Sequence, residues 1–272
     1  MIDLLIVTGG TRGIGKNIVY NSSSAAKKIL AIGSSNLVRR IEDLNNNIFS
    51  IKKDLSNIND NFEELRAFLN QHNPSSIGLS LCASQLGSHG GLLDADFEEW
   101  SNLYKVNVLG NLHVLKTTLE SIKKDIPIRV VLFGGGGGAY GYPDFSGYAL
   151  SKVAAIRAAE NIGMEFKDNY KNASIVALAP GAVSTEMLAK VESYGAEVKT
   201  RTNISEPTSF VANFITDNIP SMRLNGCFIH VRDDLEKYYN QNIEENHFKL
   251  RRIDWDCFFR TGWILRERNL AL

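Results

Sequence analysis

Short apolar runs alternate with segments of helical spacing along most of the chain. Such runs are typical of strands that are buried on both faces of a sheet. Strands that alternate with helices run parallel and are joined by right-handed crossovers. The pattern predicts an α/β fold: a doubly wound parallel sheet of about seven strands with helices on both faces. The expected strands are Leu4–Val7, Ile29–Ile32, Ile48–Ile51, Ile77–Cys82, Ile128–Phe133, Ser174–Leu178 and Cys227–Val231.

Helical segments are expected between these strands, and the alternation stops near Asp233. We therefore divide the chain into one domain over residues 1–232 and a C-terminal extension over residues 233–272. The extension is rich in charges and aromatic residues, and we expect it to pack on the body or at a subunit interface. The expected helices cover about Gly13–Ser22, Leu37–Leu44, Phe62–Leu69, Phe97–Ile122 and Tyr148–Phe166.

The composition excludes several classes of protein. The chain has 272 residues, in which 30 Lys and Arg balance 30 Asp and Glu. A dedicated nucleic-acid binder would be basic, so we expect no nucleic-acid partner. No run approaches the roughly 20 apolar residues that cross a bilayer, so we expect no membrane span, and no signal peptide either. The cysteines show neither metal-ligand spacing nor a disulfide pattern, which favours a cytoplasmic protein with reduced thiols and no metal site.

A glycine-rich turn follows the first expected strand. Thr8-Gly9-Gly10-Thr11-Arg12-Gly13-Ile14-Gly15 lies between that strand and the next helix. Glycines permit a tight turn and let backbone N–H groups approach a pyrophosphate at the helix N-terminus. A simple tight turn is the alternative, but the position in the first strand–helix unit favours phosphate binding.

With these residues in place, the chain resembles the compact single-domain branch of the short-chain dehydrogenase/reductase family. The resemblance spans about residues 3–232 and implies a Rossmann fold and a nicotinamide dinucleotide cofactor. It also implies hydride transfer to or from a carbonyl group. The landmarks that carry it are Thr8–Gly15, Asp54, Asn107, Tyr148 with Lys152, and Pro180–Thr185.

The end of the second strand indicates which dinucleotide to expect. An acidic residue there would bind the adenosine ribose and repel a 2′-phosphate, but the chain reads Gly33-Ser34-Ser35-Asn36. Ser34 and Arg12 offer a hydroxyl and a guanidinium, which favours NADP(H) over NAD(H). We interpret the nearby Arg39 and Arg40 as a solvated helix face. The residues expected to bind the cofactor are Gly9, Thr11, Arg12, Gly13, Ile14, Gly15, Ser34, Asp54, Leu55, Ala83, Tyr148, Lys152, Pro180, Gly181, Val183 and Thr185.

Tyr148 and Lys152 are four residues apart and therefore share one face of a helix. The resemblance implies that Tyr148 is the general acid/base and that Lys152 binds the nicotinamide ribose. A phenol has an ordinary pKa of about 10, so we expect the ammonium of Lys152 to lower the pKa of Tyr148. Asn107 matches the family's asparagine, which holds a water that links the lysine to solvent.

The chain departs from the family pattern at two places. The family normally has a serine thirteen residues before the tyrosine, where this chain has Gly135 within Gly134–Gly138. Loss of such a donor typically lowers the rate by about 10²–10³. The backbone N–H groups of the glycine run, Ser146 and Ser84 are the candidates to replace it. The family's Asn-Ala-Gly reads Cys82-Ala83-Ser84, where we expect altered packing and retained cofactor binding.

The substrate side is framed by Gln85–Gly91, Ala139–Asp144 and the segment after Thr185. Residues 186–205 resemble the family's mobile lid, and the charges on this segment favour a small polar metabolite as substrate. The family also implies a homodimer or homotetramer that forms through Leu103–Ile122 and Tyr148–Phe166. The side chains expected to touch the substrate are Gln85, Tyr140, Tyr142 and Ser146.

The sequence therefore predicts an NADP-dependent oxidoreductase that acts on a carbonyl or a secondary alcohol, with Tyr148 as acid/base. Because of Gly135, a non-catalytic dinucleotide-binding sensor or partner subunit is the alternative. A nucleotide-sugar epimerase or dehydratase of the longer branch fits less well, because that branch has a different glycine spacing and a longer C-terminal domain. A fold alone does not decide between these activities.

Overall fold

The computed structural model describes residues 1–35 and 47–236 of the chain. Within these residues, one sheet has the strand order β3-β2-β1-β4-β5-β6-β7, and every neighbouring pair is parallel. The predicted doubly wound sheet is confirmed. The strands are β1 (Ile2–Thr8), β2 (Ala26–Gly33), β3 (Ile48–Lys52), β4 (Ile77–Leu81), β5 (Ile128–Phe133), β6 (Ala173–Ala179) and β7 (Phe228–His230).

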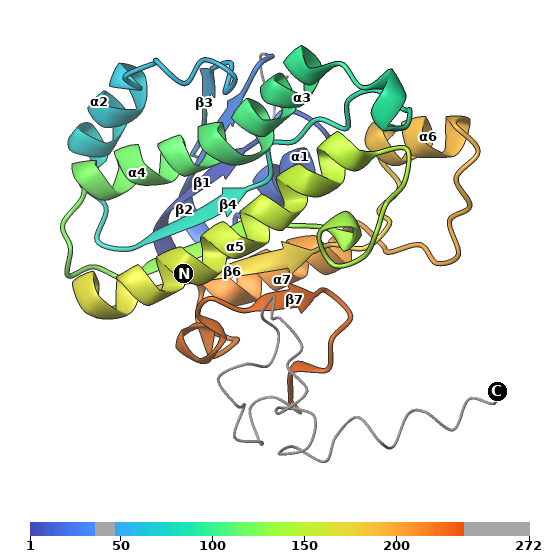
Figure 1. Cartoon of the computed structure of the whole chain (residues 1–272). Coiled ribbons are helices and arrows are strands. Elements are labelled where there is room, and N and C mark those ends of the chain that lie inside the picture. Colours follow the sequence, from blue (N-terminus) through green and yellow to red (C-terminus); the bar gives the residue numbers. More distant parts are fainter. Residues whose placement is uncertain (36–46, 237–272) are drawn as a thin grey trace.

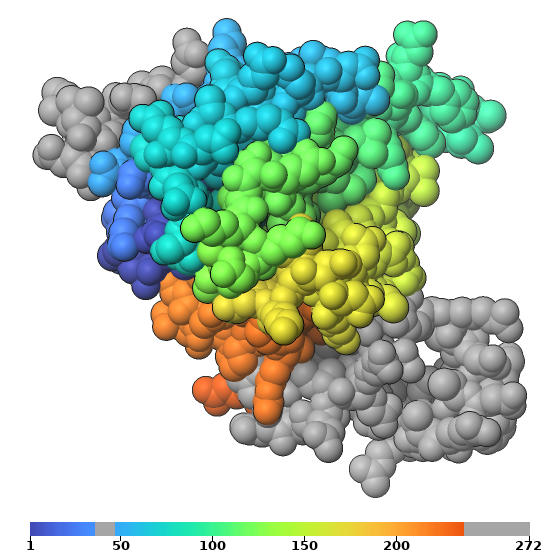
Figure 2. Space-filling model, turned by 90° about the vertical axis from the view of Figure 1, so that its left-hand side faces the viewer, coloured from blue at the N-terminus to red at the C-terminus, as the bar shows by residue number. Residues whose placement is uncertain are grey.

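Helices cover both faces of the sheet (Figure 1). One face packs against α2 (Glu63–His72), α4 (Asn111–Ser121) and α5 (Ser146–Asn169), and Figure 2 shows these segments next to one another. The other face packs against α1 (Gly13–Asn21) and α7 (Ser205–Ile215). Both apolar layers exclude water from the strands, which explains why the strand sequences are apolar without alternation.

The strand order reverses at β1, whose neighbours are β2 on one side and β4 on the other. In open α/β sheets, ligands bind beyond the carboxyl ends of the strands at this point of reversal. The glycine turn follows β1, and the Cys82-Ala83-Ser84 segment follows β4. The fold therefore brings these two segments to the edge where a dinucleotide is expected.

The helical region expected over Phe97–Ile122 consists of three pieces. α3 (Phe97–Tyr104) is followed by η3 (Lys105–Gly110), a π-helical stretch, and then by α4. Gly110 is the last residue of this stretch, and a Cβ at that position would collide with the carbonyl oxygen of Leu55. Irregular turns of this kind often mark functional sites, and this one contains the buried Asn107.

Some boundaries differ from those expected. β4 ends at Leu81, so Cys82 begins the loop, and β7 is shorter than Cys227–Val231. α7 lies where no helix is expected, although Phe210, Val211 and Phe214 have helical spacing and are buried. Short helical turns complete the described chain: η2 (Leu92–Asp94), η4 (Gly136–Gly138), α6 (Glu186–Ser193) and η5 (Ser221–Leu224).

Several predictions fall outside the described residues. They are the helix expected near Leu37–Leu44, the pair Arg39 and Arg40, and residues 237–272 of the C-terminal extension. In the part of the chain that the structure describes, no helix has the length and apolar character that a membrane span needs. The same residues contain no group of three or more His, Cys, Asp or Glu side chains suited to a metal ion.

Candidate functional site

The turn between β1 and α1 lies against the ends of the neighbouring strands. Gly9 has a φ of +64°, and a Cβ there would lie 2.9 Å from the Cα of Ala83. A Cβ at Gly15 would collide with the carbonyl oxygen of Gly9. Only glycine fits such positions, so the glycine spacing of this turn is set by backbone packing and not by flexibility.

The N-terminus of α1 fits an anionic group. Arg12 is the N-cap residue, its backbone is extended, and within the described chain no side chain caps this end of the helix. The first turn of α1 carries no acidic residue. Backbone N–H groups at such a terminus favour a phosphate. With the glycine cradle beside it, the turn fits the pyrophosphate of a dinucleotide.

Residues from three segments meet where the adenosine end would lie. The Oγ of Ser35 donates to the Oγ1 of Thr11 at 3.1 Å, which joins the end of β2 to the glycine turn. Ser34 and Arg12 are exposed. The carboxylate of Asp54 accepts from the backbone N–H of Ser56 at 2.9 Å, so Asp54 shapes the turn after β3.

The segment after β6 completes the edge of the cleft. Gly181 has a φ of +72°, and a Cβ there would collide with the Oγ1 of Thr202. Val183 is buried and forms a parallel bridge with Thr202. Thr185 caps α6, and its methyl group lies near Gly13 of the glycine turn. Pro180 and Ile14 are partly buried in the same region.

A network of buried hydrogen bonds joins β1, β4 and α4. The Oγ1 of Thr8 donates to the Oδ1 of Asn111 at 2.6 Å and accepts from the backbone N–H of Ala83 at 3.1 Å. The Nδ2 of Asn111 donates to the carbonyl of Ala83 at 2.9 Å. Asn111 is not among the residues singled out from sequence, although an asparagine in an apolar helix is a usable signal. Asn111 holds the backbone of Ala83, in the Cys82-Ala83-Ser84 segment that departs from the family pattern.

Asn107 continues this network toward α5. Its Oδ1 accepts from the backbone N–H of Gln85 at 2.8 Å, and its Nδ2 donates to the Gln85 carbonyl at 3.0 Å. The same Nδ2 donates to the Oγ of Ser151 at 3.0 Å, and Ser151 donates to the carbonyl of Tyr148 at 2.6 Å. Asn107 therefore fixes the loop after β4 relative to the first turns of α5. Its expected role in holding a water stays a prediction.

Tyr148 and Lys152 lie together on α5, as predicted from their spacing. The Nζ of Lys152 donates to the carbonyl of Phe133 at 3.0 Å and lies 5.3 Å from the centre of the Tyr148 ring. Burial lowers the pKa of Lys152 to about 8. Burial also raises the pKa of Tyr148 above its usual range, and Tyr142 raises it further.

The expected lowering of the tyrosine pKa is therefore wrong for this structure. The ammonium of Lys152 is itself buried and turned toward the Phe133 carbonyl, so desolvation dominates at the hydroxyl of Tyr148. Burial also raises the pKa of Cys82 to about 12, so this thiol stays protonated at neutral pH.

Gly135 lies directly opposite Tyr148 and Lys152. A Cβ at Gly135 would be 3.6 Å from the hydroxyl of Tyr148 and 3.8 Å from the Cγ of Lys152, which are ordinary contact distances. Its backbone is extended, a conformation open to any residue. A Cβ at Gly134 would instead face Ile156. Gly135 therefore occupies the place from which a serine side chain would face Tyr148.

The structure places the candidate replacements for that serine differently. The Oγ of Ser84 is buried and has no hydrogen-bond partner within the described residues. Ser146 is the first residue of α5. Two N–H groups at the end of the glycine run form local hydrogen bonds. The N–H of Gly138 donates to the carbonyl of Gly135, and the N–H of Ala139 donates to the carbonyl of Gly136.

The residues expected to meet the substrate separate into two groups. Tyr142 stacks on Phe145, with ring centres 5.0 Å apart, and belongs to the cluster that contains Tyr148. The side-chain oxygen of Gln85 accepts from Asn102 at 3.4 Å. Tyr140 is 80% exposed. The structure thus brings Tyr142, and not Tyr140, into the cluster around Tyr148.

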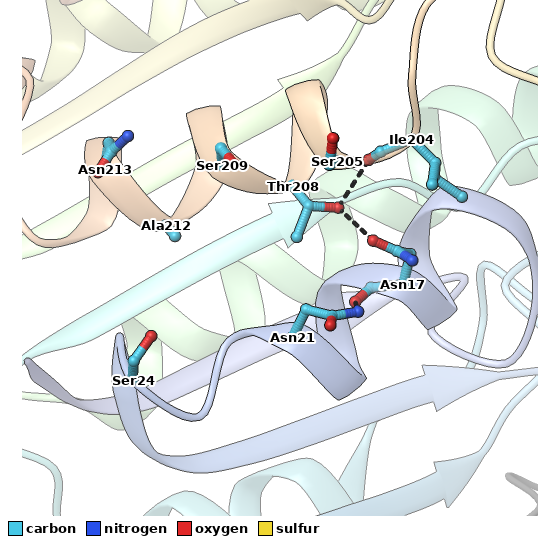
Figure 3. A pocket seen from close by; sticks show the side chains of 9 residues that line it. All are labelled: Asn17, Asn21, Ser24, Ile204, Ser205, Thr208, Ser209, Ala212 and Asn213. Atoms are coloured by element: carbon cyan, nitrogen blue, oxygen red, sulfur yellow. Dashed lines mark hydrogen bonds between the residues drawn. The ribbon is translucent and has the colours of Figure 1, made fainter.

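A separate cavity of about 410 Å³ lies between α1 and α7 (Figure 3). Asn17 and Thr208 meet across it at 2.7 Å. None of the residues singled out from sequence lines this cavity, so we do not assign the chemistry to it. Its lining residues are Asn17, Asn21, Ser24, Ile204, Ser205, Thr208, Ser209, Ala212 and Asn213.

Comparison with known proteins agrees with this geometry. Residues 3–194 match the family model described as short chain dehydrogenase. A benzil reductase ((S)-benzoin forming) from Bacillus cereus is 24% identical over 194 residues, which cover 69% of this chain and 78% of the relative. A 3-oxoacyl-[acyl-carrier protein] reductase from Brucella melitensis, solved in complex with NAD, has a TM-score of 0.71 at 18% identity. The match covers 85% of this chain and 96% of the reductase chain.

A second solved structure shares the fold. It is described as an NAD(P)-dependent gluconate 5-dehydrogenase from Beutenbergia cavernae with bound NADP, and it has a TM-score of 0.73 at 18% identity, covering 84% and 94% of the two chains. Together with the matched family model, these findings show that the chain belongs to the short-chain dehydrogenase/reductase family of NAD(P)-dependent oxidoreductases, which act on carbonyl and alcohol substrates.

Proposed function

We propose that the chain is an NADP-dependent oxidoreductase in which Tyr148 exchanges a proton with a substrate carbonyl or secondary alcohol. The observation that carries this proposal is the convergence of three groups at the carboxyl end of β5. The hydroxyl of Tyr148 and the stem of Lys152 face Gly135, where the chain presents no side chain. A substrate oxygen placed there would lie within reach of the Tyr148 hydroxyl.

The proton step follows from this arrangement. When bound, the nicotinamide supplies or accepts a hydride at the carbonyl carbon. In reduction, the hydroxyl of Tyr148 gives its proton to the carbonyl oxygen, and the nearby ammonium of Lys152 stabilises the phenolate that forms. Burial raises the pKa of Tyr148, so its hydroxyl is protonated at neutral pH and can act as the donor in reduction.

The preference for NADP(H) rests on charge at the adenosine end. Ser34 and Arg12 are exposed beside the glycine turn, and Lys52 at the end of β3 pairs in register with Gly33. Among the described residues at the end of β2 there is no carboxylate to repel a 2′-phosphate. A guanidinium and a hydroxyl are suited to such a phosphate.

The proposed setting is a cytoplasmic homodimer or homotetramer with a small-molecule substrate. Cys82 is a free thiol, in keeping with a reducing compartment. Large apolar side chains are exposed on α3, η3 and α5, where a second copy would cover them. They are Phe97, Tyr104, Leu109, Leu150, Val153 and Met164.

Replacing the acid/base tests the proposal. We expect Tyr148→Phe to lower kcat/KM for carbonyl reduction by about 10²–10⁴, the usual contribution of a general acid. Cofactor affinity, followed by nicotinamide fluorescence, should change far less than kcat/KM. Tyr170→Phe at the far end of α5 is the matched control. If the chain binds cofactor but turns over no carbonyl or alcohol in a broad screen, the sensor alternative replaces this function.

Restoring a hydroxyl at position 135 is the second test. Gly135→Ser should raise kcat/KM by about tenfold or more, because one donor at such a site is typically worth about 10²–10³ in rate. The extended backbone and the 3.6 Å spacing leave room for the side chain. Gly141→Ser is the control, since Gly141 is exposed and a Cβ there meets nothing within 4 Å. An unchanged or lower rate for Gly135→Ser would mean that other donors already fill this role.

The cofactor preference is tested by removing the guanidinium. We expect wild type to bind NADPH more tightly than NADH. Arg12→Ala should weaken NADPH binding by about 10–100-fold, as expected for a charge-assisted hydrogen bond. NADH affinity should change little and serves as the internal control. A preference for NADH in wild type, or an equal loss for both cofactors, would contradict the assignment.

A further inference from the structure

Three charged side chains of the lid, residues 186–205, are engaged in contacts that hold the lid. The Nζ of Lys190 donates to the carbonyl of Gly87 at 3.0 Å and is exposed. Arg201 pairs with Glu192 and also donates to the Oγ of Ser184 at 3.2 Å. These groups fasten the lid to itself and to the loop after β4. Three of the charges that suggested a polar substrate from the sequence therefore serve to hold the lid.

The opposite side of the lid is apolar and packs around the acid/base. Met187, Val191 and Ala196 belong to one cluster with Leu86 and Phe145, and this cluster includes Tyr142 and Tyr148. In Figure 1, α6 lies beside the start of α5, where Tyr148 is located. The ring that carries the catalytic hydroxyl is thus surrounded by apolar side chains from three segments.

Flat rings extend this cluster. Tyr142 and Phe145 stack with ring centres 5.0 Å apart and planes at 24°. His89 stacks on Tyr194 at 4.6 Å and 14°, and meets the edge of Phe145 at 5.2 Å. These four residues, which we call the aromatic wall, come from three different segments of the chain.

The glycine run leaves space next to this wall. A Cβ at Gly137 would lie 3.3 Å from the Cδ1 of Tyr142, so the glycine lets the ring approach the backbone. At Gly136 an added Cβ would meet nothing within 4 Å. Residues 135–137 therefore present bare backbone between the aromatic wall and Tyr148, where a flat group can lie against peptide planes and rings.

We propose that the substrate is a carbonyl compound, or the matching alcohol, with an aromatic or similarly flat apolar group next to the reacting carbon. This inference rests on the proposed function of Tyr148. An aromatic group placed against Tyr142 and Met187 buries apolar surface and finds ring partners. A sugar-like substrate would bring hydroxyl groups against Met187, Val191 and Leu86, which offer no hydrogen bonds, and burying such groups unpaired is costly.

Three ketones test the substrate class: two diketones that differ only beside the carbonyl pair, and one hydroxylated monoketone. The probes are 1-phenylpropane-1,2-dione, butane-2,3-dione and erythrulose, each with the reduced cofactor. We expect kcat/KM for the phenyl compound to exceed that for butanedione by about thirtyfold or more, as pocket contacts of this size allow. Equal or higher kcat/KM values for butanedione or erythrulose would overturn the inference about the substrate class. In that case, a loss of all activity in Tyr148→Phe would still support the proposed function.

Two variants, one in the lid and one in the loop before α5, locate the contact. Met187→Ala and Tyr142→Ala should each lower kcat/KM for the phenyl compound by about tenfold and change that for butanedione by less than about threefold. Met222→Ala is the matched control, because Met222 is an exposed methionine on η5. Equal losses on both diketones would indicate a general defect at the site and would overturn the assignment of Met187 and Tyr142 to the aryl group.

A binding measurement keeps the inference testable if no carbonyl is reduced. In that case the proposed function fails, and acetophenone is titrated by calorimetry into the chain loaded with oxidised cofactor. Binding that Met187→Ala weakens by about tenfold, with Met222→Ala unchanged, would support an aryl site. Absence of binding to wild type would overturn it.

Discussion

The site depends on a continuous series of buried hydrogen bonds from the first strand to the catalytic helix. Thr8 at the end of β1 is joined to Asn111, and Asn111 to the backbone of Ala83. Asn107, one helical turn earlier, holds the loop after β4 and, through Ser151, the backbone of Tyr148. Each member is buried, so each would be costly to leave unpaired. The cofactor edge and the acid/base are therefore positioned by one network.

Burial also sets the protonation behaviour of Tyr148 and Lys152 on α5. Desolvation disfavours the charged forms of both groups, and so lowers the pKa of Lys152 and raises that of Tyr148. A protonated phenol beside an ammonium is arranged to give a proton to a carbonyl oxygen. The bare backbone at Gly135 removes one donor from this arrangement and opens the space beside Tyr148. Glycine in place of serine at position 135 thus affects both the rate and the shape of substrate that the site accepts.

Much of the fold could be predicted from the sequence, since both-face burial makes each strand a continuous apolar run. The spacing of Tyr148 and Lys152 also placed them correctly, because four residues span one helical turn. The π-helical stretch and the close approach of Gly110 to Leu55 could not be predicted, since residues that are distant in sequence meet only in the folded chain. The direction of the lid charges is a similar case, because ion pairing such as that of Arg201 with Glu192 appears only in the folded chain.

The pH dependence of kcat/KM for carbonyl reduction tests the central claim most directly, namely that Tyr148 and Lys152 act as a buried proton-donor pair. Lys152, whose pKa is lowered to about 8, carries its charge below that pH and loses it above, while Tyr148 keeps its proton. We predict a constant kcat/KM up to about pH 7 and a fall that approaches tenfold per pH unit above about pH 8. A kcat/KM that stays constant or rises between about pH 7 and 10 would contradict the claim.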